Sequence, residues 1–587
     1  MLKLLKNLNK RDYIYVFIST GLIVFQVWLE LKMPDYMSNI TQLVQTRGAS
    51  INDILREGSY MLLCAFGSLV SAFIVGYFTS TIAASFSYRT RGKLFRKVED
   101  ISTFEVKKFS PSSLITRTTN DITQIEFLIA MGLTLMIKAP ITAVWAVTKI
   151  LNKNIEWSIL TGVAVLVLLI TIGIIMMIVM PKFKIVQELM DKINMVMREN
   201  LSGIRVVRAF NAEKYQEDKF ENVNNTLTNQ QVFNQKAFNF LSPVMYLVMY
   251  FLTLGIYFIG AILINEANMG DKIVLFGNMI VFSSYAMQVI MSFLMLAMIF
   301  MMLPRASVSA KRINEVLDTP ISVNEGNVTM NNSDIKGCVE FKNVSFKYPD
   351  ADEYVLEDIS FKVNKGETIA FIGSTGSGKS TLINLIPRFY DATSGEILIN
   401  GIDVRDYSFE YLNNIIGYVP QKATLFSGDI LSNVSFGKNI DGKPSNKKIA
   451  DALRVSQASE FVSKLEDGEK SHIAQGGTNI SGGQKQRLSI ARTIARNPEI
   501  YIFDDSFSAL DYKTDSTLRR ELKKYTKDAT VMIVAQRIGT ILNADKIVVL
   551  DNGKCVGIGT HNELMKKCKV YKEIALSQVS KEELENV

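Results

Sequence analysis

Nine consecutive residues in the second half of the chain have the types and spacing needed to bind nucleotide phosphates. The stretch GSTGSGKST matches the pattern GxxxxGK[ST], with a strand-like apolar run before it and an apolar helix start, TLINLI, after it. Its glycines let backbone N–H groups surround phosphate oxygens, Lys379 can reach the terminal phosphates, and the Ser380 hydroxyl can bind Mg²⁺. The expected contacts to ATP and Mg²⁺ come from Gly373, Ser374, Thr375, Gly376, Ser377, Gly378, Lys379, Ser380 and Thr381.

A second stretch, NISGGQKQR at residues 479–487, opens a helix with apolar residues at helical spacing. Ser481 has a residue type preferred at the N-cap, and the amides of Gly482 and Gly483 at a helix start would form another anion-binding end. Gln484 completes this group of expected nucleotide contacts. Taken alone, the stretch could also be a plain capped helix.

A third stretch, YIFDD, ends in Asp504 and Asp505. The four residues from Ile500 onward are apolar, which predicts a buried strand that delivers a carboxylate to a metal–nucleotide site. Asp504 lies about 125 residues after the phosphate-binding stretch, which leaves room for an inserted subdomain.

These groups need a sheet to position them, and the neighbouring sequence supplies strands. VEFKNVSFKY and YVLEDISFKVNKGETIAFIG have the alternation and β-branched content of strands. The fold class expected for this half of the chain is therefore an α/β phosphate-loop domain, at residues 337–575, followed by a short tail, 576–587. A polar, turn-rich linker is expected at 313–336.

The first half, residues 1–312, is predicted to be a helical transmembrane domain. A membrane span needs about 20 predominantly apolar residues, and six runs qualify, at 13–33, 58–82, 127–150, 157–181, 241–264 and 275–303. The amino terminus and the segments 83–126 and 182–240 are rich in Lys and Arg. The positive-inside rule therefore places both termini, and the nucleotide-binding half, in the cytoplasm.

The two long loops between spans are predicted to be helical extensions of those spans, because apolar residues keep helical spacing among the charges. A break at Phe109–Ser113 predicts a turn with a short helix at its tip. Within the spans, Lys138 could belong to a translocation path, form a structural ion pair, or extend its ammonium group toward the membrane interface. The sixth span carries a stripe of methionines on one helical face: Met287, Met291, Met295, Met298 and Met302. The stripe could line a promiscuous apolar surface, although ordinary helix packing is the favoured interpretation.

Composition agrees with two such halves. The chain has 587 residues, a formal net charge of +8 and four scattered cysteines without metal-binding spacing, so free thiols in a reducing compartment are expected. No nucleic-acid partner is expected.

Taken in order, these motifs resemble those of an ABC transporter. The set comprises Tyr348, GSTGSGKST, Gln421 in YVPQKATLFSG, NISGGQKQR, YIFDD and SALD ending at Asp511. With six spans ahead of it, the chain is similar to one half of a bacterial ABC exporter of the multidrug type. SLITRTTND and ENLSGIRVVRAF are likewise similar to that family's coupling regions.

The resemblance implies a role for each matched residue. Tyr348 would stack on adenine, Gln421 would sense Mg²⁺ and the attacking water, and Asp504 would hold Mg²⁺ through water. Asp511 would lie where two nucleotide-binding domains meet. ATP would be bound between two such domains, so one chain must dimerise.

Three positions depart from the family pattern. Asp505 stands where a catalytic Glu is usual, with one methylene less, and Gln536 stands where a switch His is usual. Gln475 replaces a frequent Glu ahead of the signature stretch. Because Gln donates a hydrogen bond but does not exchange a proton near neutral pH, hydrolysis at this chain's own site is expected to be impaired.

The residues expected to bind ATP are intact, whereas the residues expected to act in hydrolysis are altered. This combination resembles the degenerate half of a heterodimeric ABC exporter. This interpretation implies a second half-transporter subunit, contact with membrane lipid and a small amphipathic substrate. Alternatives are a homodimeric exporter with weak ATPase activity, a peptide or lipid exporter, and a regulatory ATP-binding membrane subunit or gated channel.

Overall fold

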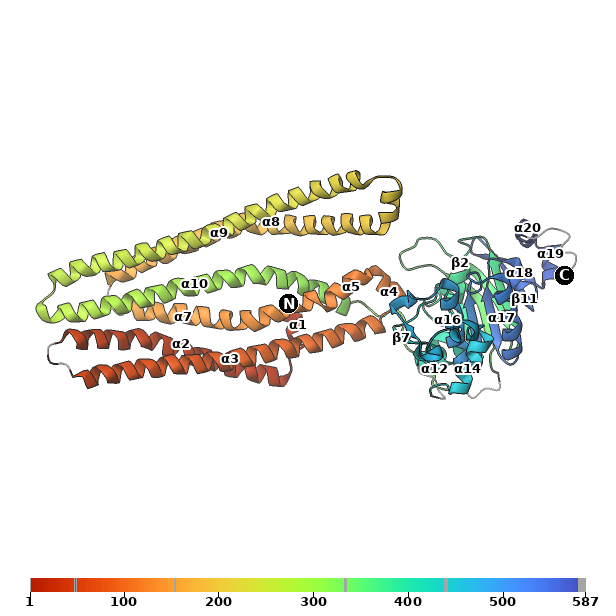
Figure 1. The fold of residues 1–587 in the computed structure, drawn as a ribbon, viewed down its shortest axis with the longest axis horizontal. Helices are drawn as coiled ribbons and strands as arrows, with labels where there is room; N and C mark the ends of the chain where they lie inside the picture. Colours follow the sequence, from red (N-terminus) through yellow and green to blue (C-terminus); the bar gives the residue numbers. More distant parts are fainter. Residues whose placement is uncertain are drawn as a thin grey trace. The chain divides into compact units, whose positions relative to one another are not determined.

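The computed structural model describes residues 2–46, 48, 50–151, 155–331, 335–437 and 442–578. The chain divides into two compact units. The first consists of Met1–Val98 with Ser110–Asp318, and the second of Glu99–Phe109 with Thr319–Val587. Figure 1 shows the first unit as long helices and the second as β-sheets with shorter helices around them.

The first unit confirms the prediction of six apolar stretches long enough to cross a membrane. The third of them is built from three α-helices and a π-helical turn, η1. The elements are α1 (Leu2–Leu5), α2 (Lys10–Gln45), α3 (Ile51–Asp100), α5 (Pro111–Thr118), α6 (Asn120–Phe127), η1 (Leu128–Gly132), α7 (Leu133–Leu151), α8 (Ile155–Ala209), α9 (Glu213–Glu266) and α10 (Met269–Leu317).

The long loops are helical, as their periodicity predicts. α8 and α9 continue well beyond the spans at 157–181 and 241–264 and pack along each other. They are joined at a tight turn in which Asn211 has a φ of 48°, a conformation that Asn tolerates better than most residues.

Helix α10 packs against α2, α7 and α9 (Figure 1). Tyr285 of α10 is fully buried, and its hydroxyl lies 3.0 Å from the carbonyl oxygen of Leu31 and 2.8 Å from Asp35 Oδ1, two acceptors that share its single proton. Trp157 of α8 packs on Phe282 of α10 with ring centroids 5.3 Å apart. Hydrogen-bonding the buried hydroxyl matters because an unsatisfied polar group is costly in an apolar medium.

The predicted break in the first long loop is confirmed. A short helix, α4 (Thr103–Lys108), lies between α3 and α5, and α5 begins with Pro111 at a position that suits proline. The α4 segment belongs to the second unit, where Lys107 Nζ donates to the Tyr390 hydroxyl at 3.3 Å.

One expectation about the linker needs correction. Residues 313–317 are helical because α10 continues to Leu317, and Ile313 and Val316 are fully buried at its end. Burial of these side chains stabilises the last turns despite the polar residues around them. The expected tail, 576–587, begins inside the last helix, since 576–578 complete α20; residues 579–587 lie outside the described residues.

The second unit is an α/β domain with three sheets, in strand orders β12-β11-β3-β10-β9-β6, β2-β1-β4-β5 and β7-β8. The strands are β1 (Val339–Phe346), β2 (Leu356–Val363), β3 (Thr368–Gly373), β4 (Ser394–Ile399), β5 (Ile402–Asp403), β6 (Ile416–Val419), β7 (Gly428–Asp429), β8 (His472–Ile473), β9 (Ile500–Asp504), β10 (Thr530–Val534), β11 (Lys546–Asp551) and β12 (Lys554–Gly559).

Helices surround these sheets. The α-helices are α11 (Lys379–Asn384), α12 (Phe409–Ile415), α13 (Ile430–Val434), α14 (Asn446–Val455), α15 (Ser459–Val462), α16 (Gly482–Arg496), α17 (Tyr512–Tyr525), α18 (Ile538–Ile541), α19 (His561–Lys567) and α20 (Lys569–Gln578). Short 3₁₀ turns are η2 (Val404–Asp406), η3 (Gly468–Lys470) and η4 (Gln475–Gly477).

The larger sheet brings the chemically interesting segments to one edge. β3, β10, β9 and β6 are parallel neighbours, and β9 and β10 are buried at every residue, as expected for strands covered on both faces. Because ligands bind beyond the carboxyl ends of such strands, the segments that follow Gly373, Asp504, Val534 and Val419 are placed to form one site.

Candidate functional site

The phosphate loop joins β3 to α11 with a backbone that requires glycine. Gly376 and Gly378 have φ values of +88° and +93°, in the left-handed region that glycine adopts readily. A Cβ on Gly373 would lie 2.1 Å from the carbonyl oxygen of Leu550. The loop is therefore closely packed against the neighbouring strand and ends at the helix N-terminus of α11.

Lys379 is folded over this loop. Its Nζ donates to the carbonyl oxygens of Gly373 at 2.9 Å and Ser374 at 2.7 Å, and to Ser377 Oγ at 3.3 Å. Burial lowers the pKa of Lys379, against the opposing effect of Asp505 and Asp504. Among the described residues, the hydrogen-bond acceptors of this ammonium are neutral oxygens, so it is available to an anionic ligand.

Ser380 and Asp504 meet where a metal ion is expected. Ser380 Oγ donates to Asp504 Oδ1 at 2.9 Å, and the Tyr418 hydroxyl of β6 lies 3.4 Å from Asp504 Oδ2. Burial raises the pKa of Asp504. The sequence analysis did not predict Tyr418 as a site residue. Its position three residues before the expected site residue Gln421 could have indicated it.

Asp505 is the point at which three strand ends meet. Its Oδ2 accepts from Gln536 Nε2 at 2.9 Å and from Gln421 Nε2 at 3.2 Å. The two glutamines follow β10 and β6 and are far apart in sequence. The structure thus brings together all three residues predicted to govern hydrolysis, and it places the carboxylate between the two amides.

The backbone of Asp505 is held in an uncommon conformation. Its φ is 45° and its N–H donates to the carbonyl oxygen of Val534 at 3.1 Å. The residue is 8% exposed, and burial raises its pKa. A short side chain fixed in this way has little freedom to reach a reactant that lies further from the strand.

The signature stretch forms the N-terminus of α16, as predicted. Ser481 Oγ accepts from the backbone N–H of Gln484 at 3.3 Å, and Gln484 Oε1 accepts from the Ser481 N–H at 2.8 Å. This reciprocal capping box holds the helix start. A Cβ on Gly482 would meet nothing within 4 Å, so the helix start has open space for a ligand.

Two further predicted residues are placed by packing. The Tyr348 hydroxyl lies 3.1 Å from Thr381 Oγ1, and its ring meets that of Tyr390 edge-on at 5.4 Å between centroids. Because Lys107 of α4 hydrogen-bonds the same Tyr390, α4 and the predicted adenine-stacking residue share a neighbour. Asp511 caps α17, since its Oδ1 accepts from the Thr514 N–H at 3.0 Å.

In the helical unit, Lys138 forms an ion pair, which was one of the alternatives expected for it. Its Nζ lies 2.8 Å from Glu30 Oε1, which also accepts from Gln26 at 2.9 Å. The pair borders a cavity of about 190 Å³ that Met291 and Met295 of the methionine stripe also line. Both features singled out in the spans therefore meet at one place.

The site fits ATP with Mg²⁺. The glycine-dependent loop, the buried ammonium and the helix start of α11 suit phosphates, while the Ser380 hydroxyl and the Asp504 carboxylate are the oxygen ligands that Mg²⁺ prefers. In the described part of the chain there is no group of three or more His, Cys, Asp or Glu residues able to hold a metal ion alone. The residues of this chain that would hold a metal ion here are Ser380 and Asp504.

Comparison with known proteins connects this site and the six apolar helices. Residues 356–508 match the model of the ABC transporter family, and residues 16–303 match the ABC transporter transmembrane region. An uncharacterized ABC transporter ATP-binding protein of Mycobacterium tuberculosis is 40% identical over 554 residues, covering 92% of this chain and 93% of that protein.

Two further proteins are similar over most of the chain. A putative multidrug export ATP-binding/permease protein of Bacillus subtilis is 32% identical, covering 85% of this chain and 84% of that protein. The fold matches that of a bacterial Atm1-family ABC exporter solved with ATP bound, with a TM-score of 0.82, 22% identity and coverage of 97% of this chain and 100% of that structure. The chain therefore belongs to the ABC transporter family, as an exporter half-transporter in which a multi-pass membrane region precedes one nucleotide-binding domain.

Proposed function

We propose that the chain is one half of a heterodimeric ATP-driven exporter and carries the slower of its two ATP sites. The observation that supports this proposal is the arrangement around Asp505, whose carboxylate accepts hydrogen bonds from both Gln421 and Gln536. The phosphate-binding groups are complete, whereas both positions specific to hydrolysis differ from the family pattern. A site of this kind binds ATP well and cleaves it slowly.

The residues of this chain divide the work at its own site. The loop amides and Lys379 bind the phosphates, and Ser380 with Asp504 hold Mg²⁺, which when bound neutralises phosphate charge. Asp505 has the charge of a general base, but its side chain ends about an ångström short, and displacement of that size can cost about 10² in rate. Gln536 supplies a hydrogen-bond donor without a proton to exchange.

The signature stretch serves the other site. In the proposed dimer, Ser481, Gly482 and Gly483 face the partner's phosphate loop, and Asp511 lies at the contact between the two nucleotide-binding domains. Support comes from the intact capping box and the open space beside Gly482. This half would therefore be required for hydrolysis at the faster site as well.

In the membrane, we propose that both termini and the nucleotide-binding domain are cytoplasmic, on the evidence of Lys- and Arg-rich loops. The transported compounds are proposed to be small and amphipathic, and the similarity to a putative multidrug export protein of Bacillus subtilis supports a drug-like substrate. A homodimer with weak ATPase activity is the competing proposal.

Co-purification with the product of a neighbouring gene tests the heterodimer. The partner is expected to be a half-transporter of similar length with Glu after its strand-end Asp and His at its switch. Steady-state ATPase is measured for this chain alone and for the pair, with and without amphipathic compounds. A dimer of this chain alone with full substrate-stimulated ATPase would refute the heterodimer.

A further inference from the structure

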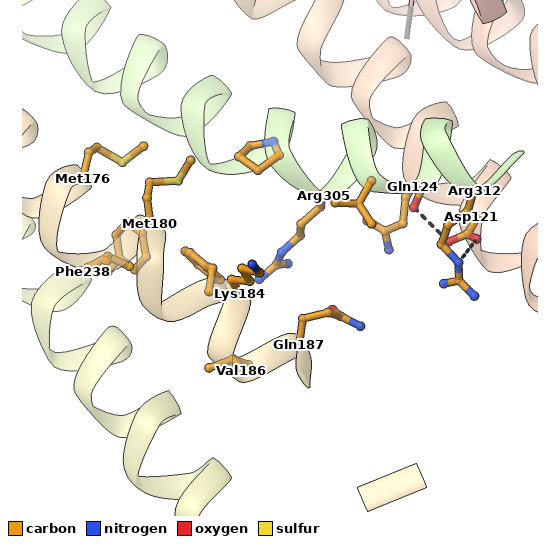
Figure 2. Close-up of a pocket in the computed structure, with 15 residues that line it drawn as sticks. Asp121, Gln124, Met176, Met180, Lys184, Val186, Gln187, Phe238, Arg305 and Arg312 are labelled. Carbon is orange, nitrogen blue, oxygen red and sulfur yellow. Dashed lines mark hydrogen bonds and ion pairs between the residues drawn. The ribbon is translucent and has the colours of Figure 1, made fainter. Parts of the chain in front are cut away.

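The helical unit contains a cavity of about 540 Å³ between α6, α8, α9 and α10, away from the Lys138 ion pair. Its lining is polarised from one end to the other. Figure 2 shows one end formed by Met176, Met180 and Phe238, the other by Asp121, Gln124 and Arg312, and Lys184 and Arg305 between them.

The apolar end lies within the predicted spans, and the charged part lies at their ends. Met176, Val179 and Met180 belong to the run 157–181, whereas Lys184 and Arg305 follow the runs 157–181 and 275–303 by a few residues. The cavity thus passes from the depth expected for lipid hydrocarbon to the depth expected for headgroups. A ligand with an apolar body and a polar head matches this gradient.

The charge of the lining is positive. Asp121 is the one acid among the described residues that line the cavity; it is 6% exposed, accepts from Ser309 Oγ at 2.9 Å and pairs with Arg312 Nε at 3.5 Å. Lys184 and Arg305 have no carboxylate partner in the part of the chain that the structure describes, and the Arg305 guanidinium lies 5.9 Å from the Phe183 ring centroid. Among the described residues, these two cations on the cavity wall therefore have no compensating carboxylate.

A neighbouring cavity of about 620 Å³ shares Phe183, Phe238 and Arg305 with the first. Asn234 lines it, is 6% exposed, and has a buried Oδ1 with no hydrogen-bond donor within the described ranges of the chain. Because a buried amide oxygen is costly to leave without a donor, a ligand group with an O–H or N–H would be stabilised by a hydrogen bond to this atom.

Ordinary membrane anchoring explains these cations only in part. Lys and Arg are common at the cytoplasmic ends of spans, where they reach toward lipid headgroups. That role requires neither a cavity wall nor an apolar end opposite the charges. It also does not supply a hydrogen-bond donor to the buried Oδ1 of Asn234.

We propose that this pair of cavities binds amphiphiles with an anionic head that also carries a hydrogen-bond donor. The head lies between Lys184 and Arg305, within reach of Asn234, and the apolar body lies against Met176, Met180 and Phe238. Charge-assisted hydrogen bonds to the two cations favour an anion, whereas a cationic amphiphile meets uncompensated like charges. This inference rests on the proposed export function and names its substrate class.

Binding to the assembled transporter in phosphatidylcholine nanodiscs, without nucleotide, provides the test. Three probes with the same decyl chain and different heads are compared below their micelle-forming concentrations: decyl phosphate, decylphosphocholine and decyltrimethylammonium. Decyl phosphate should bind most tightly. Lys184→Glu and Arg305→Glu should each weaken its binding about tenfold or more, as loss of a charge-assisted hydrogen bond predicts.

Matched controls are available on the same helices. Lys192 of α8 and Lys311 of α10 are exposed and do not line either cavity, so Lys192→Glu and Lys311→Glu should leave binding unchanged. Asn234→Leu should weaken the binding of decyl glycerophosphate, which bears hydroxyl groups, more than the binding of decyl phosphate. Lys184→Arg and Arg305→Lys keep the charge and should bind decyl phosphate within a few-fold of the parent.

The inference is overturned if decyltrimethylammonium binds as tightly as decyl phosphate, or if the control reversals weaken binding as much as those in the cavity. ATPase measurements separate this outcome from failure of the proposed function. Stimulation of ATPase by cationic amphiphiles alone would refute the anionic class and leave export standing. Charge-selective binding without stimulation by any amphiphile would refute export and leave the binding site standing.

Discussion

Replacing Asp505 by Glu together with Gln536 by His should restore part of the hydrolysis at this chain's own nucleotide site. Both changes act at one oxygen, since Asp505 Oδ2 accepts from Gln536 at 2.9 Å. The longer side chain would extend the carboxylate by about an ångström beyond the strand end, and an error of that size costs about 10² in rate. We therefore expect a gain of about 10- to 100-fold, below the roughly 10² to 10⁴ of a fully positioned base.

The structure also predicts that the two changes are coupled. Groups in direct hydrogen-bond contact show interaction energies of about 0.5–3 kcal/mol, which corresponds to a departure from multiplicative effects of about 2- to 150-fold. Either change alone should gain little, because the remaining partner still suits the original side chain. Gln421, which shares the same oxygen, is left unchanged in all variants.

Single-turnover hydrolysis in a background with the partner's site inactivated measures both quantities. Asp528→Glu is the matched control, because it makes the same chemical change at an exposed position. If the effects of the two single changes on the hydrolysis rate simply multiply in the double variant, the predicted coupling through the contact at Asp505 is contradicted. No gain from the double change would refute the idea that these two residues limit hydrolysis, and would point to the phosphate loop or to the partner's signature stretch.

Three further predictions use other parts of the chain. Ser481→Arg should abolish most steady-state ATPase activity of the assembled transporter, because a bulky cation would block the helix N-terminus that binds at the partner's site. Lys379→Ala should leave a higher residual ATPase rate. An equal or greater loss of ATPase activity from Lys379→Ala would reverse the assignment of slow and fast sites. Lys138→Met should lower the free energy of unfolding, measured by thermal unfolding, by about 3 kcal/mol, because it leaves the Glu30 carboxylate in the bundle without its cation. The double change Lys138→Met with Glu30→Gln should recover part of that loss. No recovery would indicate that packing alone is responsible. Burial lowers the pKa of His561 below its ordinary value of about 6.5. Its contribution to stability is therefore present above that pH and is lost as the pH falls through the folded-state pKa. His561→Gln should flatten the stability profile below about pH 6.5, and an unchanged profile would refute the role of His561.

Much of the architecture could be predicted from the sequence because the signals are local. The number of apolar stretches follows from their length and composition, the helical loops from apolar spacing, and the N-cap at Ser481 from residue type and the glutamine three residues later. The glycines of the phosphate loop are needed for a backbone conformation that can be recognised from nine consecutive residues. Each of these features depends on neighbours in the sequence.

Local signals were weaker at the ends of elements. The linker was expected from residue 313 because the sequence becomes polar there, yet burial of Ile313 and Val316 extends α10 to Leu317. The Asp511 side chain caps α17, which follows from its position before a helix, but its expected place between two domains concerns a partner and remains a prediction.

The sequence by itself determined which residues could bind a nucleotide and which stretches could cross a membrane. Only the tertiary structure decided how distant residues meet: Gln421, Asp505 and Gln536 leave three parallel strands and converge on one oxygen, and Lys138 pairs with Glu30 across 108 positions in the chain. Strand order and helix packing set these contacts, and neither is encoded in any short stretch, because burial of apolar surface can be satisfied by many pairings until the whole fold selects one.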